Sequence, residues 1–290
     1  MKAAGRTDGR DTLVALLVSV LVAMPVLVGV TYASAASAGL VGPGAGAPST
    51  GRLLRVLADG QTWAGLVWSV SVASVATVIA SAGAIAIAVC FRGRGKSDRV
   101  ARALAAAPLP LPHLVAAALA VWVLGQSGVL ARVAFALGWI TTPSAMPALI
   151  YDRWGIGLVL TMAWKEMAFL SVVATALLST RAVAAEETAR TLGATGWETF
   201  RRVTFPVLWR GLMPAVVAVF IFVVGSYEAA VLLAPSAPLA LPLLVAERAA
   251  DPDVSRRGDA FVVTLVLLLM GIVAVVAHEW VRARWESLEE

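Results

Sequence analysis

Apolar residues along the chain gather into long runs that are separated by shorter polar segments. A helix needs roughly 20 apolar residues to cross about 30 Å of hydrocarbon, and six of the runs approach or exceed that length. The pattern therefore predicts an all-α integral membrane protein with six transmembrane helices. The expected spans cover approximately residues 13–32, 63–91, 107–124, 155–178, 211–233 and 260–280.

Prolines and glycines refine these limits. Pro108, Pro110 and Pro112 stand at every second position at the start of the third run, and each proline keeps the residue before it extended. Regular helix is therefore expected only from about Pro112. Residues 126–152 are mixed in composition and are expected to hold a short interfacial helix. The fifth run is expected to continue through Gly225 as one span.

Composition excludes an ordinary soluble domain. The 290 residues are 60% hydrophobic and 14% charged, whereas soluble domains carry about 25% charged residues. One cysteine, Cys90, allows no internal disulfide. Two histidines, His113 and His278, lie far apart in the sequence, so no Cys/His metal cluster is expected. The sequence predicts no metal and no cofactor bound by this chain.

Basic residues concentrate on alternate sides of the spans. The N-terminus, a dense basic loop at residues 92–102, the segment 179–210 and the C-terminal tail hold most of the lysines and arginines. Cytoplasmic loops of membrane proteins are the basic ones, which predicts a cytoplasmic location for both termini. We divide the chain into an N-terminal segment 1–60 with the first span and an external loop, a five-helix core 61–284, and a cytoplasmic tail 285–290.

The N-terminus has two interpretations. Lys2, Arg6 and Arg10 precede the first apolar run, and small residues follow it at 33–35, as in a secretory signal peptide. The run is long for the apolar region of a signal peptide. We therefore favour an uncleaved first span, although cleavage within residues 1–33 is the alternative.

The segment 185–208 is a polar, helix-forming stretch between two spans. Glu186 and Glu187 would lie in the first turn of a helix, where carboxylates complement the helix dipole. Gly193 can take a left-handed conformation and end that helix. A second helix should follow and end at Pro206. Its apolar face is formed by Trp197, Phe200 and Val203.

Periodicity alone allows two roles for this helix–turn–helix. Its apolar face could enter a groove in a partner protein. It could equally rest on lipid headgroups as an amphipathic surface element.

The segment resembles the "EAA" signature of permease subunits of binding-protein-dependent ABC importers. That signature asks for Glu-Ala-Ala, three residues, Gly, nine residues, Ile, one residue and Leu-Pro. The matching positions are Glu187-Thr188-Ala189, Gly193, Val203 and Phe205-Pro206, with conservative replacements at Thr188, Val203 and Phe205. The similarity extends more weakly over residues 63–280.

The resemblance implies a type I importer permease fold with cytoplasmic coupling helices in a bacterial cytoplasmic membrane. It implies two copies of an ATP-binding subunit that hold ATP and Mg²⁺, a second permease subunit, an extracytoplasmic substrate-binding protein and lipid as partners, and no nucleic acid. The chain itself would be a transport subunit and not an enzyme, working by ATP-driven alternating access. The residues implied in ATPase coupling are Glu186, Glu187, Ala189, Leu192, Gly193, Ala194 and Pro206.

The chain carries no complete nucleotide-binding motif of its own. Gly95-Lys96-Ser97 resembles the end of a phosphate-binding loop, but Cys90 stands where that motif needs its first glycine. This agrees with an ATPase on a separate subunit.

Charged residues inside the expected spans are candidates for the translocation path. Lys165 and Glu166 lie in the fourth span, and Glu228 lies in the fifth beside Ser226 and Tyr227. Intramembrane charges usually face protein or water. Structural ion pairs between spans are one explanation, and a place on the path, above all for Glu228, is the other.

The substrate expected from the resemblance is a polyamine or a similar cation. The Leu192-Gly193-Ala194 form and Gly225-Ser226-Tyr227-Glu228 look like permeases for polyamines, ferric iron or thiamine. An anionic Glu228 could meet a cation. The alternative class is a secondary transporter or another polytopic membrane protein without an ATPase, but a secondary transporter would need an ion-coupling site and usually internal repeats.

Overall fold

The structure is a computed structural model that describes residues 9–287. All regular elements in this range are helical, which confirms the all-α prediction. Within residues 9–287, six helical stretches have the length and apolar composition to cross a membrane. They are Thr12–Ser37, Gly60–Cys90, His113–Ala136, Ile156–Thr180, Gly196–Val224 and Asp259–Trp285.

The described residues form two compact units. One holds the residues up to Asp59 together with Val245–Val266, and the other holds Gly60–Leu244 and the residues from Leu267 onward. The first unit contains α1 (Gly9–Ser37), α2 (Gly51–Ala58) and part of α12 (Leu241–Ala249) and α13 (Asp259–Glu286). The expected external loop thus contains helix α2.

Ion pairs hold the first unit together. Asp259 is only 1% exposed, and its carboxylate accepts two hydrogen bonds from Arg55, at 2.9 and 3.2 Å. Arg52 is also buried and donates to the carbonyl oxygens of Ala36 and Gly44. The hydrogen bond to Asp259 raises the pKa of Arg55, against the lowering effect of desolvation. A buried carboxylate is tolerated here because it is paired and hydrogen-bonded.

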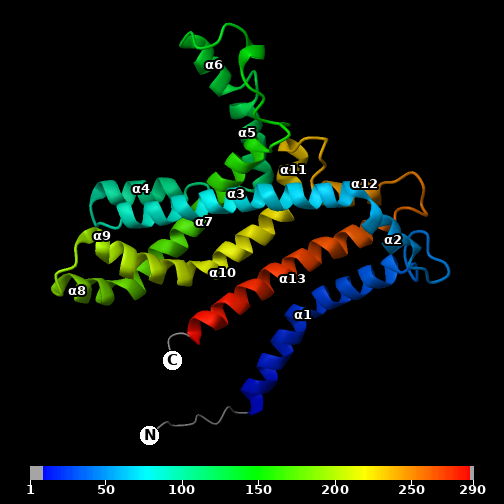
Figure 1. The fold of residues 1–290 in the computed structure, drawn as a ribbon, viewed down its shortest axis with the longest axis horizontal. Coiled ribbons are helices and arrows are strands. Elements are labelled where there is room, and N and C mark those ends of the chain that lie inside the picture. Colours follow the sequence, from blue (N-terminus) through cyan, green and yellow to red (C-terminus); the bar gives the residue numbers. More distant parts are fainter. Residues whose placement is uncertain (1–8, 288–290) are drawn as a thin grey trace. The chain divides into compact units, whose positions relative to one another are not determined.

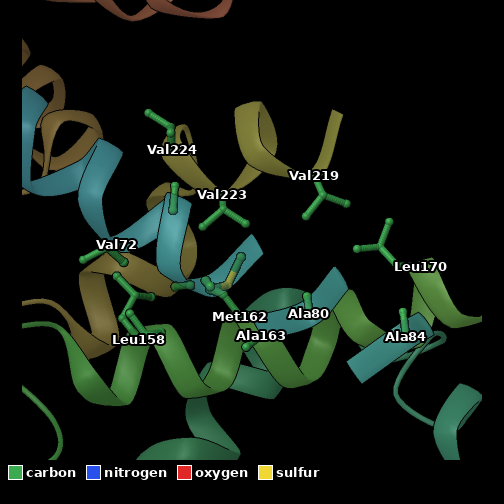
Figure 2. Close-up of a cluster of buried hydrophobic side chains, with 14 of the residues drawn as sticks. Val72, Ala80, Ala84, Leu158, Met162, Ala163, Leu170, Val219, Val223 and Val224 are labelled. Carbon is green, nitrogen blue, oxygen red and sulfur yellow. The ribbon is translucent and has the colours of Figure 1, made fainter. Parts of the chain in front are cut away.

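The second unit is built around three long helices that lie side by side, α3 (Gly60–Cys90), α7 (Ile156–Leu177) and α10 (Phe205–Val224) (Figure 1). Alanines on the buried face of α3, including Ala80 and Ala84, allow a close approach of α7. Figure 2 shows these alanines facing Met162 and Leu170 of α7 and Val219 of α10. The hydrophobic core of this unit therefore lies between α3, α7 and α10.

The expected start of regular helix near Pro112 is confirmed, and so is a helix within residues 126–152, whose interfacial location stays a prediction. Helix α5 (His113–Leu124) begins directly after Pro112, and a short helix α6 (Val129–Ala136) lies within residues 126–152. A three-residue 3₁₀ turn, Pro143–Ala145, follows it.

The expectation of a basic loop at residues 92–102 is wrong. Helix α4 (Lys96–Ala106) occupies most of it and packs against α7. The Asp98 carboxylate accepts a hydrogen bond from the Gly95 amide at 3.2 Å at the start of this helix. No proline lies between residues 92 and 107, so a helix of this length can form there.

The fifth span is broken, which corrects the expectation of one helix through Gly225. Helix α10 ends at Val224, and a separate helix α11 (Tyr227–Leu233) follows. Gly225 is a poor helix former, and Ser226 takes an extended backbone conformation with ψ of 94°. The side chains at 226–228 therefore lie at a break in a span.

Candidate functional site

The segment 185–208 extends two spans and does not form an independent surface motif. A π-helical turn, Leu178–Ala182, joins α7 to α8 (Val183–Thr191). After a turn, α9 (Gly196–Thr199) continues through a second π-helical turn, Phe200–Thr204, into α10. Helices α8 and α9 thus form a hairpin at the same end of the bundle as α4 (Figure 1), which we call the basic end.

The expectation that Pro206 ends the second helix is wrong, because the helix runs through it. Pro206 lies in the first turn of α10, directly after the π-helical turn. Proline lacks the backbone N–H, and its ring clashes with the carbonyl one turn earlier in a regular helix. A π turn displaces that carbonyl and accommodates such disruptions.

Gly193 forms the turn between the two helices, as predicted. Its φ of +88° lies in the left-handed region, and the Gly193 and Ala194 amides donate to the carbonyls of Arg190 and Ala189 at 2.9 and 3.0 Å. Those bonds satisfy the last carbonyls of α8, as in a glycine-ended helix. No atom lies within 4 Å of the Cβ position at Gly193, so the backbone conformation, not space, favours glycine there.

A capping box starts the second helix. The Thr195 amide donates to the Glu198 carboxylate at 2.9 Å, and the Glu198 amide donates to the Thr195 hydroxyl at 3.3 Å. Such a box satisfies helix-end donors reciprocally. Both sides of the turn are therefore fixed by local hydrogen bonds.

Glu186 anchors the hairpin from inside. Its side chain is buried, and its carboxylate accepts two hydrogen bonds from Arg92 at 2.8 and 3.0 Å and one from the Thr204 hydroxyl at 2.5 Å. Arg92 follows α3, and Thr204 ends the π turn before α10. One carboxylate thus connects α3, α8 and α10.

Glu186 is among the residues that the resemblance implies in coupling, whereas Arg92 and Thr204 are not. Arg92 was one of several basic residues in a presumed loop, and Thr204 occupies an unspecified position of the signature. No sequence signal distinguished either residue, because their contacts join segments far apart in the chain.

The outer side of the hairpin is exposed and partly apolar. Leu192 is 83% exposed and Trp197 is 68% exposed. Glu187 and Gly193 are also exposed, while Ala189, Ala194 and Pro206 are half-buried. The seven sequence-predicted residues therefore divide into one buried anchor and six residues at or near the surface.

Aromatic rings extend this apolar surface along the second helix. The ring centroids of Trp197 and Phe200 lie 5.6 Å apart, and those of Phe205 and Trp209 lie 6.0 Å apart. Phe200 also contacts Phe205, at 6.1 Å between centroids. The apolar face expected from residues 197–203 thus continues into α10.

Lys165 and Glu166 are both buried within the second unit. The Glu166 carboxylate lies 2.8 Å from His113 Nε2 at the start of α5, and the His113 ring packs on Phe222 of α10 at 4.6 Å between centroids. Lys165 Nζ donates to the Leu109 carbonyl at 3.4 Å. His113 was not predicted as a site residue, and its position directly after Pro112 is the only sequence signal for it.

Glu228 lies apart from these groups. It begins α11 after the break in the fifth span, where Glu228 and Tyr227 are exposed and Ser226 is buried. Among residues 9–287, no ion pair or hydrogen bond joins Glu228 to Lys165 or Glu166. The structure therefore brings Glu166 together with His113 and leaves Glu228 on the surface of this chain. The same range contains no group of His, Cys, Asp or Glu that could hold a metal ion.

The model of the family described as binding-protein-dependent transport system inner membrane component matches residues 80–287. This chain belongs to that family. The match covers all three long helices of the second unit in whole or in part and the complete hairpin, so the expected family and the type I importer permease fold are confirmed.

Curated relatives of this chain are distant. A probable sulfate transport system permease protein of Nephroselmis olivacea is 29% identical over 151 residues, which are 50% of this chain and 51% of the relative. An inner membrane ABC transporter permease protein of Escherichia coli (strain K12) is 28% identical over 120 residues, which are 41% of this chain and 24% of the relative. The chain thus spans about half the length of the first relative and about a quarter of the second.

Solved structures resemble this chain over most of its length. One belongs to a bacterial alginate ABC transporter in complex with an alginate pentasaccharide-bound periplasmic protein; it has a TM-score of 0.71, 16% identity and 96% coverage of both chains. A chain of an amino acid ABC transporter has a TM-score of 0.55 and 16% identity, and the alignment covers 81% of this chain and 99% of that one. At this identity the likeness establishes the fold.

Proposed function

We propose that this chain is the permease subunit of an ABC importer and moves a small solute by ATP-driven alternating access. Family membership and the six apolar helices support a membrane transport subunit. ATP and Mg²⁺ would bind to two copies of a separate ATP-binding subunit. The observation that carries this proposal is the hairpin of α8 and α9, whose base is fixed by the buried Glu186 and whose tip is exposed.

The hairpin has the properties that a mechanical connection requires. Glu186 fixes its base to Arg92 after α3 and to Thr204 before α10. The tip, with Leu192 and Trp197, projects exposed apolar side chains. An apolar tip on a helical support can enter a groove of an ATP-binding subunit and transmit its movement to both attached spans.

The proposed orientation places the basic end and both termini in the cytoplasm. Arg92, the arginines of α4 and those of the hairpin lie at this end, and basic segments are retained on the cytoplasmic side. A second permease subunit, identical or different, would complete the path. A substrate-binding protein would dock on the opposite side, and the structural relative that is in complex with a periplasmic protein supports such a partner.

Two observations point to different substrates. A polyamine or similar cation agrees with an exposed carboxylate at Glu228 in a broken span, because an anionic side chain at membrane depth should face protein or water. The curated relatives named for sulfate transport favour an oxyanion instead. We retain the cation as the proposal that rests on Glu228 and sulfate as the alternative to be tested against it.

The importer proposal is tested by purifying the tagged chain from its native membrane in mild detergent. Mass spectrometry of its partners and an ATPase assay should reveal an ATP-binding subunit. Leu192→Asp places a charge on the apolar tip and should abolish this association. Val100→Asp, on the half-exposed face of α4, is the matched control and should retain it.

Either of two results would contradict the proposal. If Leu192→Asp retains a fully stimulated ATPase, the tip is not the contact. If the wild-type chain purifies without any ATPase, the hairpin is an amphipathic surface element and a secondary transporter becomes the better interpretation.

Uptake measurements separate the two substrates. Vesicles that contain the complete transporter should accumulate labelled putrescine, and Glu228→Gln should reduce this uptake. If the variant transports cations as well as the wild type does, the role of Glu228 is wrong. Accumulation of labelled sulfate without putrescine would overturn the cation proposal.

A further inference from the structure

A cavity of about 410 Å³ opens at the basic end, between the loop that follows α3 and helix α8. Its wall is rich in arginine and contains fewer carboxylates than guanidinium groups. The charged lining residues are Arg92, Arg94, Arg102, Arg190, Glu186 and Glu187. The cavity therefore carries a net positive charge.

Two of these arginines are already engaged by the protein. Arg92 is neutralised by Glu186 through two hydrogen bonds. Arg102 Nη1 donates to the Phe91 carbonyl and, at 3.0 Å, to the Gly93 carbonyl. These bonds fix the Arg102 guanidinium in place and use only one of its nitrogens, although the group carries several N–H donors.

The other two arginines have unused donors. Arg94 and Arg190 are exposed at the cavity and form no hydrogen bond or ion pair with any residue in the described range 9–287. A guanidinium binds phosphate through paired N–H donors and holds its charge at any physiological pH. Arg94 and Arg190 together with Arg102 therefore offer donors for an anionic group with more than one oxygen.

A groove beside the cavity indicates whether the bound phosphate belongs to a lipid or to a soluble molecule. It has a volume of about 260 Å³ and runs along the spans past Ile87, Val172 and Ala176. It shares the lining residues Arg102, Thr175 and Ser179 with the basic cavity, so the two spaces lie side by side. A soluble phosphate would leave this groove empty, whereas the acyl chain of a lipid would fill it.

We propose that the cavity binds the phosphate of an anionic phospholipid, with one acyl chain in the adjoining groove. Basic pockets between membrane helices on the cytoplasmic side bind anionic lipid headgroups. The assignment relies on the orientation given in the proposed function. Because α8 forms one wall of the cavity, a bound lipid would attach the hairpin to the bilayer.

The test measures lipid retained by the full-length chain, purified in mild detergent and examined by native mass spectrometry. Dioleoyl-phosphatidylglycerol should bind more tightly than dioleoyl-phosphatidylcholine. The double substitution Arg94→Gln/Arg102→Gln should weaken phosphatidylglycerol binding about thirtyfold, at roughly fivefold per arginine. Arg99→Gln removes an exposed arginine of α4 outside the cavity and should leave binding unchanged.

A second variant does not disturb the loop that Arg102 supports. Ala176→Trp fills the groove from an exposed position on α7 and should weaken phosphatidylglycerol binding while all arginines remain. Equal binding of the two lipids, or an equal effect of Arg99→Gln, would overturn the site. If soluble glycerol phosphate displaces the lipid, the ligand of the cavity is a soluble anion, and the proposed lipid site is wrong.

The measurement is independent of the proposed importer activity. It uses the chain without an ATP-binding subunit, so a failure of ATPase association leaves the lipid result intact. Conversely, a chain that recruits its ATPase but shows no preference for phosphatidylglycerol would disprove only the lipid site.

Discussion

Glu166 and Glu186 lie on one continuous helical path, α7 with its π turn and α8, yet their partners differ. Each is less than 10% exposed. Glu186 accepts hydrogen bonds from Arg92, which is always charged, and from the Thr204 hydroxyl. Glu166 receives His113, which is charged only when it is protonated.

The Glu186 pair is therefore charged on both sides at any physiological pH, whereas the Glu166 pair is so only when His113 is protonated. A buried carboxylate is costly unless it is paired, and a guanidinium provides that pairing in every state of the molecule. The base of the hairpin is thus held by a fixed charge pair. In the middle of the spans, Glu166 is paired with an imidazole and Lys165 with a backbone carbonyl. These contacts are weaker than the pair of Glu186 and Arg92, so they can rearrange at a smaller cost in free energy.

The largest effect is expected at the hairpin anchor. Glu186→Ala should destabilise the chain by about 2–3 kcal/mol, below the roughly 3–5 kcal/mol of a fully buried pair, because Arg92 is partly exposed. Thermal unfolding in detergent measures this loss. Glu187→Ala is the matched control, and an equal loss there would show that Glu186 has no special role.

The next effect is expected at the middle of the spans. His113→Ala leaves the Glu166 carboxylate without its imidazole partner, and we expect a loss of about 2 kcal/mol. Glu166→Gln should cost less, because an amide can still hydrogen-bond to His113. If Glu166→Gln costs as much as Glu186→Ala, the two contacts are equivalent and the comparison fails.

A smaller effect is expected at the hairpin turn. Gly193→Val forces a β-branched residue into a left-handed conformation, at roughly 1–2 kcal/mol. If the proposed ATP-binding subunit docks on the tip, the variant should also reduce stimulation of its ATPase. Gly193→Asn tolerates this conformation and is the control. Unchanged uptake and ATPase stimulation in the valine variant would contradict the coupling role.

The smallest effect is expected from the hydroxyl at the anchor. Thr204→Val keeps the shape and removes the hydrogen bond to Glu186, so the expected loss is about 1 kcal/mol. A double-mutant cycle with Glu186→Gln measures the coupling between the two residues. Strictly additive losses would show that the Thr204 bond contributes nothing to the anchor.

Much of the local structure could be predicted because its causes are local. The six apolar runs, the start of α5 after Pro112 and the left-handed turn at Gly193 follow from composition and from the conformational limits of proline and glycine. Continuity across Pro206 was missed, because a π turn depends on how the flanking helices are joined and not on the proline alone.

The sequence by itself determined the membrane class, the family and the polar segment whose left-handed turn at Gly193 is exposed. The tertiary structure alone decided which of two neighbouring glutamates is the anchor and which charge in the spans has a partner. Glu186 contacts Arg92 and Glu166 contacts His113, over separations of 94 and 53 residues. Such contacts depend on how α3, α5 and α7 pack against one another, and periodicity along one helix carries no information about the residue that the next helix places opposite.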